Sequence, residues 1–426
     1  MRLERRRGAG VPCRVDGVGR SLLLTAAGCS VAMVPPARAS AQGPAPRATL
    51  TESLDLHVPV APTPVRIDGR IHLVYELHLT NPRADTVVLT RIRVVGDADT
   101  TRPLADLAGN ELARRVQPFG RTRSPIPATT LPPGVRRIHH AWVALPAGAI
   151  APRALRHYVD ASEGASPGGA EIQLRGAPVT VARATPAVLH APLRGGDWAA
   201  LYDPLLFGGH RMAIYTIDGR ARIPGRFAID LVRLPPTGTF DPHARGLERN
   251  GFGAEVLAVA DGVITAAVDD MPDNDDTPGA PRRRFPMEQA SGNYVALALA
   301  DGRVAFYEHL KAGSLRVRRG THVRAGDVLA QLGYSGSSSI GPHLHFHVSD
   351  GNSLLGAEGV PFVFRTYREL GAFAGIEAFV AGAPWLPRAG RGERPGVGRR
   401  EEMPAPNSVI DFGTAVGRDG AGAPRR

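Results

Sequence analysis

The chain has 426 residues, enough for two or three domains of ordinary size. Its hydrophobic fraction of 43% and charged fraction of 21% are typical of globular proteins, which excludes wholesale disorder. The formal net charge of +11 gathers at the two ends, since residues 1–41 carry +5 and residues 388–426 carry +3. A nucleic-acid-binding protein concentrates positive charge on its folded part, so we expect no nucleic-acid partner.

Residues 1–41 have the three parts of an export signal. Six arginines precede an apolar stretch from Ser21 to Val34, and Ala39-Ser40-Ala41 fits a cleavage site. We therefore expect a signal peptide over residues 1–41 and a mature protein exported to the periplasm, the cell envelope or the medium. The apolar stretch is shorter than the ~18 residues of a membrane span, so no transmembrane span is expected in the mature chain.

Both cysteines, Cys13 and Cys29, lie within this leader. Its removal would leave a mature chain with no disulfide and no cysteine-ligated metal. Lipoprotein anchoring at Cys29 is a minor alternative, because Ala26-Ala27-Gly28-Cys29 faintly resembles a lipoprotein box.

Residues 49–190 are predicted to form a β-sandwich whose role the sequence does not indicate. Two long apolar or alternating runs, Ile71–Leu79 and Val87–Val95, flank the turn segment Asn81–Asp85. Further short strands are separated by proline and glycine clusters, and no long stretch has helical periodicity. Short strands at this spacing are typical of a sandwich.

Residues 205–365 form a second strand-rich block after a connector over residues 191–204. Glycines stand at nearly every expected turn of this block. From residue 382 onward proline, glycine, alanine and arginine dominate, which predicts a disordered tail over residues 382–426. The expected fold class is therefore all-β.

The second block contains a histidine pattern that indicates a metal. His343, His345 and His347 alternate along an expected strand, so their imidazoles lie on one face. Asp230 ends another expected strand, Arg226–Asp230. A carboxylate with neutral imidazoles suits zinc, and a hydrolytic zinc site keeps one position open for water.

Several segments of this block, taken in order, resemble the lysostaphin/LytM-type zinc metallopeptidases. They are Gly253–Val263, Gly292–Val295, Tyr307–Leu310, Val323–Gly326, Gly333–Gly336 and Gly341–Phe346. The resemblance covers about a third of the chain. It implies the duplicated hybrid motif fold, an all-β domain with an open groove, and hydrolysis of peptidoglycan peptides.

The resemblance also implies roles for individual residues. It makes Asp230 and His345 zinc ligands, and His309 and His343 catalytic residues that do not bind the metal. Such imidazoles take a proton from a zinc-activated water and stabilise the oxyanion. The implied cofactor is Zn²⁺ and the implied partner is the peptide part of peptidoglycan.

One position departs from the family pattern. Arg226 stands where the family has its first histidine ligand, and an arginine stays protonated and cannot bind zinc. We predict that His210 replaces it, on a strand over residues 209–214. A three-residue turn at residues 218–220 would pair His210 with Ala228, on the face of Asp230, whereas a two-residue turn at 218–219 would pair it with Phe227, on the wrong face. His243 and His347 are weaker candidates.

The leading hypothesis is thus an exported zinc metalloendopeptidase that acts on cell-wall peptides. One alternative, supported by Arg226, is a catalytically degenerate domain that binds the wall or regulates another hydrolase. Another is an adhesion or carbohydrate-binding module that uses the N-terminal sandwich.

Overall fold

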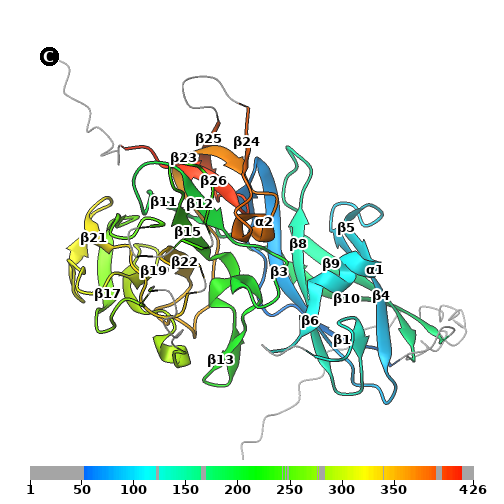
Figure 1. Cartoon of the computed structure of the whole chain (residues 1–426). Helices are drawn as coiled ribbons and strands as arrows, with labels where there is room; N and C mark the ends of the chain where they lie inside the picture. Colours follow the sequence, from blue (N-terminus) through cyan, green and yellow to red (C-terminus); the bar gives the residue numbers. More distant parts are fainter. Residues whose placement is uncertain are drawn as a thin grey trace, which may run out of the picture. The chain divides into compact units, whose positions relative to one another are not determined.

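The computed structural model describes residues 52–414, apart from residues 121–123, 165–168, 242, 245, 247–248, 276, 278–283, 339 and 390–395. The leader expected over residues 1–41 lies outside the described residues. The described residues from 52 to 414 form one compact unit (Figure 1). It is nearly all β, which confirms the predicted fold class. No helix in the described ranges is long and apolar enough to cross a membrane.

The N-terminal block is a sandwich of two five-stranded sheets, as predicted. The first sheet has the order β1-β3-β8-β6, with β2 also paired to β3. Its strands are β1 (Asp55–His57), β2 (Val65–Ile67), β3 (Arg70–Thr80), β6 (Val116–Pro118) and β8 (Arg136–Ala144).

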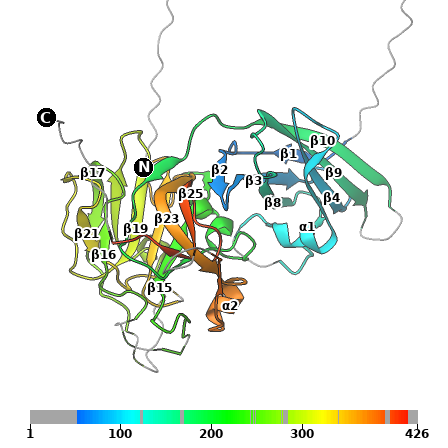
Figure 2. The ribbon, with the colours of Figure 1, turned by 90° about the horizontal axis from the view of Figure 1, so that it is seen from above.

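The second sheet of the sandwich has the order β10-β9-β4-β5, with β7 also paired to β4. Its strands are β4 (Val87–Gly96), β5 (Pro103–Ala108), β7 (Thr130–Leu131), β9 (Ala154–Glu163) and β10 (Glu171–Thr180), and the helix α1 (Gly109–Arg115) follows β5. The strands β4, β9 and β10 are labelled in Figure 2. Leu77 and Leu79 of the first sheet pack with Ile92 and Val159 of the second in one core. The alternation of apolar residues along these strands produces this two-layer packing.

The second block is built on a twelve-stranded sheet. Its order is β11-β23-β26-β12-β15-β22-β19-β18-β17-β20, with β24 and β25 also paired to β23. The strands are β11 (Ala187–Leu189), β12 (Trp198–Leu201), β15 (Ile229–Arg233), β17 (Gly262–Val268), β18 (Asn293–Ala298), β19 (Val304–Leu310), β20 (His322–Val323), β22 (Leu344–Ser349), β23 (Phe362–Ala372), β24 (Leu386–Pro387), β25 (Val397–Glu402) and β26 (Ser408–Asp411).

Smaller elements complete this block. They are the paired strands β13 (Tyr215–Ile217) and β14 (Arg220–Arg222), the paired strands β16 (Glu255–Leu257) and β21 (Val328–Gln331), the helix α2 (Ile376–Val380), and the 3₁₀ helices η1 (His210–Met212), η2 (Pro224–Phe227) and η3 (Met287–Gln289). Every residue of β19 and β22 is buried. Polar side chains on these two strands therefore lie inside the protein.

The prediction of disorder from residue 382 onward is wrong for β24, β25 and β26. The strand β26 lies between β12 and β23, and its Val409 and Ile410 are fully buried. None of these short segments could bury enough apolar surface alone, but each gains a ladder of hydrogen bonds from strands already in place. Composition therefore underestimated the order of this part of the chain.

The predicted hairpin around residue 218 is also wrong in register. Ile217 pairs with Arg220, so the turn has two residues, Asp218 and Gly219, not three. Both turn residues have positive φ, which is the conformation that an Asp-Gly hairpin turn favours. The segment expected as a strand over residues 209–214 contains η1, and the first part of the expected strand Arg226–Asp230 belongs to η2.

Candidate active site

Three directly opposed residues form a row across the centre of the large sheet. Asp230 of β15 pairs with His345 of β22, and His345 pairs in turn with Glu308 of β19. Directly opposed residues of neighbouring strands share a face, so the imidazole lies between two carboxylates. Nδ1 of His345 hydrogen-bonds to Oδ1 of Asp230 at 2.9 Å, and its Nε2 lies 3.6 Å from Oε1 of Glu308.

His210 reaches the same site from η1. Its Nε2 lies 3.3 Å from Oδ2 of Asp230, and its ring centre lies 4.5 Å from that of His345. Donor atoms of His210, Asp230 and His345 all lie within 4.8 Å of one another, close enough to bind one metal ion. The structure thus brings together the three residues proposed as ligands, although His210 arrives on a 3₁₀ turn and not on the expected strand.

A glycine permits this approach of η1. A Cβ on Gly225 of η2 would lie 2.9 Å from the carbonyl oxygen of His210 and 3.0 Å from its Cβ. Such contacts require the backbone to shift. The absence of a side chain at position 225 therefore allows η1 to pack against η2 and to present His210 to Asp230.

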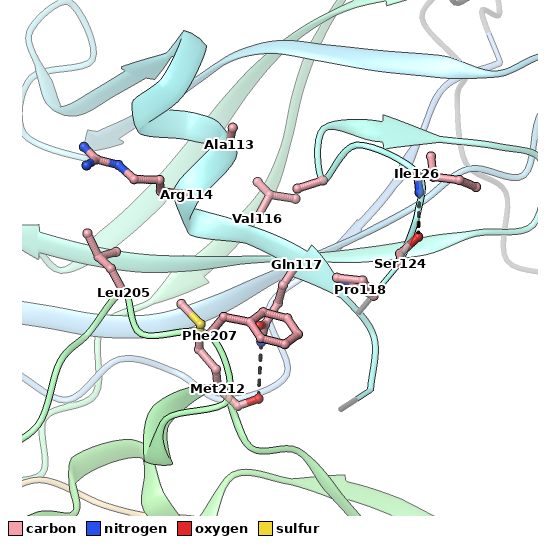
Figure 3. Close-up of a pocket in the computed structure, with 11 residues that line it drawn as sticks. Ala113, Arg114, Val116, Gln117, Pro118, Ser124, Ile126, Leu205, Phe207 and Met212 are labelled. Atoms are coloured by element: carbon pink, nitrogen blue, oxygen red, sulfur yellow. Dashed lines mark hydrogen bonds between the residues drawn. The ribbon is translucent and has the colours of Figure 1, made fainter. Parts of the chain in front are cut away.

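The N-terminal sandwich holds η1 in place through hydrogen bonds to the two residues that follow His210. Nη2 of Arg211 donates to the carbonyl oxygens of Tyr75 on β3 and Ala141 on β8, at 3.2 and 2.8 Å. Figure 3 shows Gln117 of β6 donating to the carbonyl oxygen of Met212, at 3.3 Å, beside a pocket of about 350 Å³. The segment that carries His210 is therefore fixed from the sandwich side.

Arg226 points to a different set of partners. Its guanidinium is buried and pairs with Glu76 of β3 and with Glu358, at 2.9 Å in each case. Its Nη1 also donates to the carbonyl oxygen of Gly359 at 3.0 Å. Arg226 thus links the sandwich to the second block, and His210 supplies an imidazole at the site.

Two further imidazoles lie beside the group of His210, Asp230 and His345. His343 has its Nε2 3.4 Å from Oδ1 of Asp230, and its ring centre lies 4.6 Å from that of His309. Nδ1 of His309 lies 2.8 Å from the carbonyl oxygen of Ser335, and Nδ1 of His343 lies 2.9 Å from that of Gly341. These carbonyl oxygens accept from protonated Nδ1 atoms, which leaves Nε2 of a neutral His309 able to accept a proton, while Nε2 of His343 faces the carboxylate of Asp230.

A backbone irregularity places His309. The ladder between β18 and β19 shifts register between Asn293 and Val295, and His309 has a left-handed φ of 62°. A bulge of this kind redirects a side chain. Consecutive strand residues normally point to opposite faces, yet both Glu308 and His309 lie close to His345. Positive φ at a non-glycine residue is uncommon and often found at functional sites.

Burial and neighbouring charges separate the pKa values in this cluster. Burial lowers the pKa of His210 to about 4 and that of His309 to about 3, so both imidazoles are neutral at pH 7. Burial would likewise lower the pKa of His345, but the carboxylates of Glu308 and Asp230 outweigh it and raise that pKa to about 9. Burial would raise the pKa of Asp230, whereas His210 and His343 hold it well below its usual range.

A second possible metal-binding group shares His345. It consists of Glu308, His345 and His347. The side chains of Glu308 and His347 are only 8% and 3% exposed, whereas those of Asp230 and His210 are 14% and 32% exposed. A hydrolytic metal needs an open position for water and substrate, which favours the group with His210. His347 therefore lies behind the site, and His243 lies in an exposed turn outside both groups.

A pocket opens beside the accessible ligands. It has a volume of about 560 Å³, and its lining includes His210 and Asp230, the carboxylates of Asp203 and Glu377, and several apolar side chains. The apolar residues in its wall are Leu201, Leu206, Ile340, Ile376 and Val380. A peptide substrate could approach the site from this side.

The sequence matches the model of peptidase family M23 over residues 245–355. Residues 245–355 are an M23 domain. The match includes His309, His343 and His345 and ends well after them, whereas His210 and Asp230 precede it. No curated protein matches the chain.

Solved structures with some likeness to the chain come from the same family. The catalytic domain of lysostaphin from Staphylococcus simulans is 19% identical, covers 40% of this chain and 94% of its own, and has a TM-score of 0.21. A mutant catalytic domain of the prophage-encoded M23 protein EnpA from Enterococcus faecalis is 17% identical. It covers 41% of this chain and 93% of its own, and has a TM-score of 0.24. A putative M23 peptidase from Pseudomonas aeruginosa is 16% identical. It covers 63% of this chain and 93% of its own, and has a TM-score of 0.23. Such low scores add nothing to the family match.

The prediction from sequence missed Glu308 as a member of the site. Glu308 stands between Tyr307 and His309 in the family-like segment, where strand alternation places it on the face opposite His309. Only the bulge brings both residues to the site, and the sequence gives no clear signal for that bulge.

Proposed function

We propose that the chain is an exported zinc metalloendopeptidase that hydrolyses peptide bonds of bacterial cell-wall peptidoglycan. The M23 match supports a peptidase, and the donor set of two imidazoles and one carboxylate suits zinc. The observation that carries the proposal is the distance of 3.3 Å between Nε2 of His210 and Oδ2 of Asp230. It gives the site a third donor although Arg226 occupies the family's first ligand position.

In this proposal His210, Asp230 and His345 hold the metal. Bound zinc acts as a Lewis acid that polarises a peptide carbonyl and makes water acidic enough to ionise near pH 7. His309 and His343 lie beside the donors with their Nδ1 atoms turned to backbone carbonyls. Their Nε2 atoms can accept a proton from water and then donate to the charge that develops on the substrate oxygen.

The decisive experiment combines metal analysis with wall digestion. The purified protein should contain close to one zinc per chain, digest peptidoglycan, lose that activity in a chelator and regain it with zinc. The variant His210→Ala should lose both zinc and activity, whereas His243→Ala serves as the matched control because His243 is exposed and outside the site. A protein that binds no zinc and digests no wall would instead support the catalytically degenerate alternative.

Export is part of the same proposal and rests on the three-part leader in residues 1–41. N-terminal sequencing of the exported protein should begin near Gln42. A mature protein that retains Met1–Ala41 would contradict export by this signal, and a lipid on Cys29 would favour anchoring as a lipoprotein.

A further inference from the structure

Behind the proposed ligands lies a buried carboxylate that contacts two imidazoles. Oε1 of Glu308 lies 3.6 Å from Nε2 of His345 and 3.1 Å from Nδ1 of His347. All three side chains come from the adjacent strands β19 and β22. Glu308 is thus placed on the side of the His345 ring that faces away from Asp230.

The two nitrogens of His345 therefore face different carboxylates. Nδ1 is the atom nearest Asp230, at 2.9 Å, and lies on the side where His210 also converges. Nε2 faces Glu308. A histidine that binds a metal through one nitrogen commonly donates its other N–H to a carboxylate, which fixes the tautomer and the orientation of the ring.

His347 adds an independent observation. Its side chain is 3% exposed and its ring stacks on Phe306, with ring centres 4.9 Å apart. Its Nδ1 lies 3.1 Å from Oε1 of Glu308, whereas its Nε2 has no hydrogen-bond partner among the described residues. A buried polar ring is costly unless it is paired, so a ring aimed at Glu308 is best explained by an interaction with that carboxylate.

We propose that Glu308, supported by His347, is a positioning residue for the metal site. Glu308 accepts the Nε2–H of His345, so that Nδ1, which here donates to Asp230, would be the ring nitrogen that binds the metal once the ion takes the place of that proton. His347 holds the carboxylate from the other side. This inference rests on the proposed zinc site and assigns no contact between Glu308 and the substrate.

Zinc affinity tests the inference directly. Competition with a chromophoric chelator is measured for the full mature chain and for Glu308→Gln, His347→Phe and Asp230→Asn. The control is Glu288→Gln, since Glu288 is an exposed carboxylate on η3. His347→Phe retains an aromatic ring against Phe306, and thermal unfolding of each metal-free variant identifies any that fails to fold.

Removal of an outer carboxylate of this kind typically weakens metal binding about 10–100-fold. We expect such a loss in Glu308→Gln, a smaller loss in His347→Phe, a loss greater than either in Asp230→Asn, and none in the control. Nitrogen-15 spectra of the histidine rings in the zinc form should show Nε2 of His345 protonated in the wild type. Glu308→Gln should shift the Nε2–H resonance of His345 in the zinc form, a change that loss of packing alone would not produce.

Three results would overturn the inference. Wild-type affinity in a folded Glu308→Gln variant would show that the carboxylate has no such role. Loss of all zinc binding in Glu308→Gln with retention in Asp230→Asn would place the metal in the group of Glu308, His345 and His347. A wild-type chain without zinc affinity would reject the proposed function itself and the inference with it.

Discussion

Nη2 of Arg226 lies 2.9 Å from Oε2 of Glu76, a residue 150 positions earlier in the chain. Both side chains are buried, and Glu358 completes the group on the other side of the guanidinium. Arg226, which the resemblance aligns with a metal ligand, therefore connects the sandwich to the second block. The same sandwich strand, β3, also accepts a hydrogen bond from Arg211, the neighbour of His210.

Replacement of Arg226 should destabilise the protein. Arg226→Met would remove the cation 2.9 Å from two buried carboxylates, which keep only the longer contacts with Arg211 and Arg222, at 3.7 and 3.4 Å. Removal of one partner from a buried ion pair costs about 3–5 kcal/mol. The free energy of unfolding in urea measures this effect. Arg318→Met is the control, because Arg318 is exposed. A loss below about 1 kcal/mol, the range of an exposed ion pair, would mean that these pairs contribute little.

Restoring the family residue should not restore a family-like site. In Arg226→His the ion pairs with Glu76 and Glu358 are lost, and His210 already contacts Asp230. We expect lower stability and no gain in zinc affinity, measured by chelator competition. Tighter zinc binding in this variant would contradict the assignment of His210 as the ligand in place of residue 226.

Stability should depend on pH through Glu76. Burial alone would raise its pKa, but Arg226, His140 and Arg211 outweigh burial and hold that pKa well below its usual value of 4.5. A carboxylate with a depressed folded pKa contributes stability above its unfolded pKa and loses it as the pH falls. The wild type should therefore lose stability progressively below about pH 4.5. Glu76→Gln should be less stable than the wild type at pH 7, and its stability should fall less steeply as the pH is lowered. Urea midpoints at successively lower pH measure both proteins. Parallel stability profiles of the two proteins would exclude a contribution of Glu76 to the pH dependence.

Gly225→Ala should weaken metal binding without changing a ligand. The added Cβ would meet the backbone of His210 at 2.9 Å, so η1 must move away from η2 and from Asp230. We expect a loss of zinc affinity on the order of tenfold or more, the lower end of what loss of ligand positioning produces, alongside reduced wall digestion. Gly398→Ala is the matched control, since a Cβ there meets no atom within 4 Å. Equal affinities in the two variants would show that η1 accommodates the methyl group.

His309→Ala and His343→Ala should abolish turnover while zinc remains bound. Their proposed roles are proton transfer and stabilisation of the oxyanion, and loss of such groups typically lowers the rate by about 10²–10⁴-fold. The measurements are the rate of wall-peptide hydrolysis and the zinc content of each variant. Full activity in both would reject this mechanism, and zinc loss in His343→Ala would move the ligand assignment to that residue.

Local patterns in the sequence were enough to predict the all-β class, the two strand-rich blocks and most residues of the candidate site. Alternating apolar residues require a two-layer sandwich to bury them, and the His-x-His spacing places His343 and His345 on one face of a strand. These are local patterns, so they can be recognised without knowledge of which strands pair. His210 was also singled out for proximity to Asp230, and the two side chains do approach each other, although the hairpin register behind that prediction was wrong.

The way these residues meet depends on pairing between strands that lie far apart in the chain. The order β15-β22-β19 places Asp230, His345 and Glu308 in one row, a long-range pairing that no local pattern encodes. The bulge at His309 depends on the neighbouring strand β18. The tail strand β26 is ordered because β12 and β23 provide hydrogen-bonding partners on both sides. Contacts between residues far apart in the chain therefore determine the site geometry, while the local pattern supplies the chemistry.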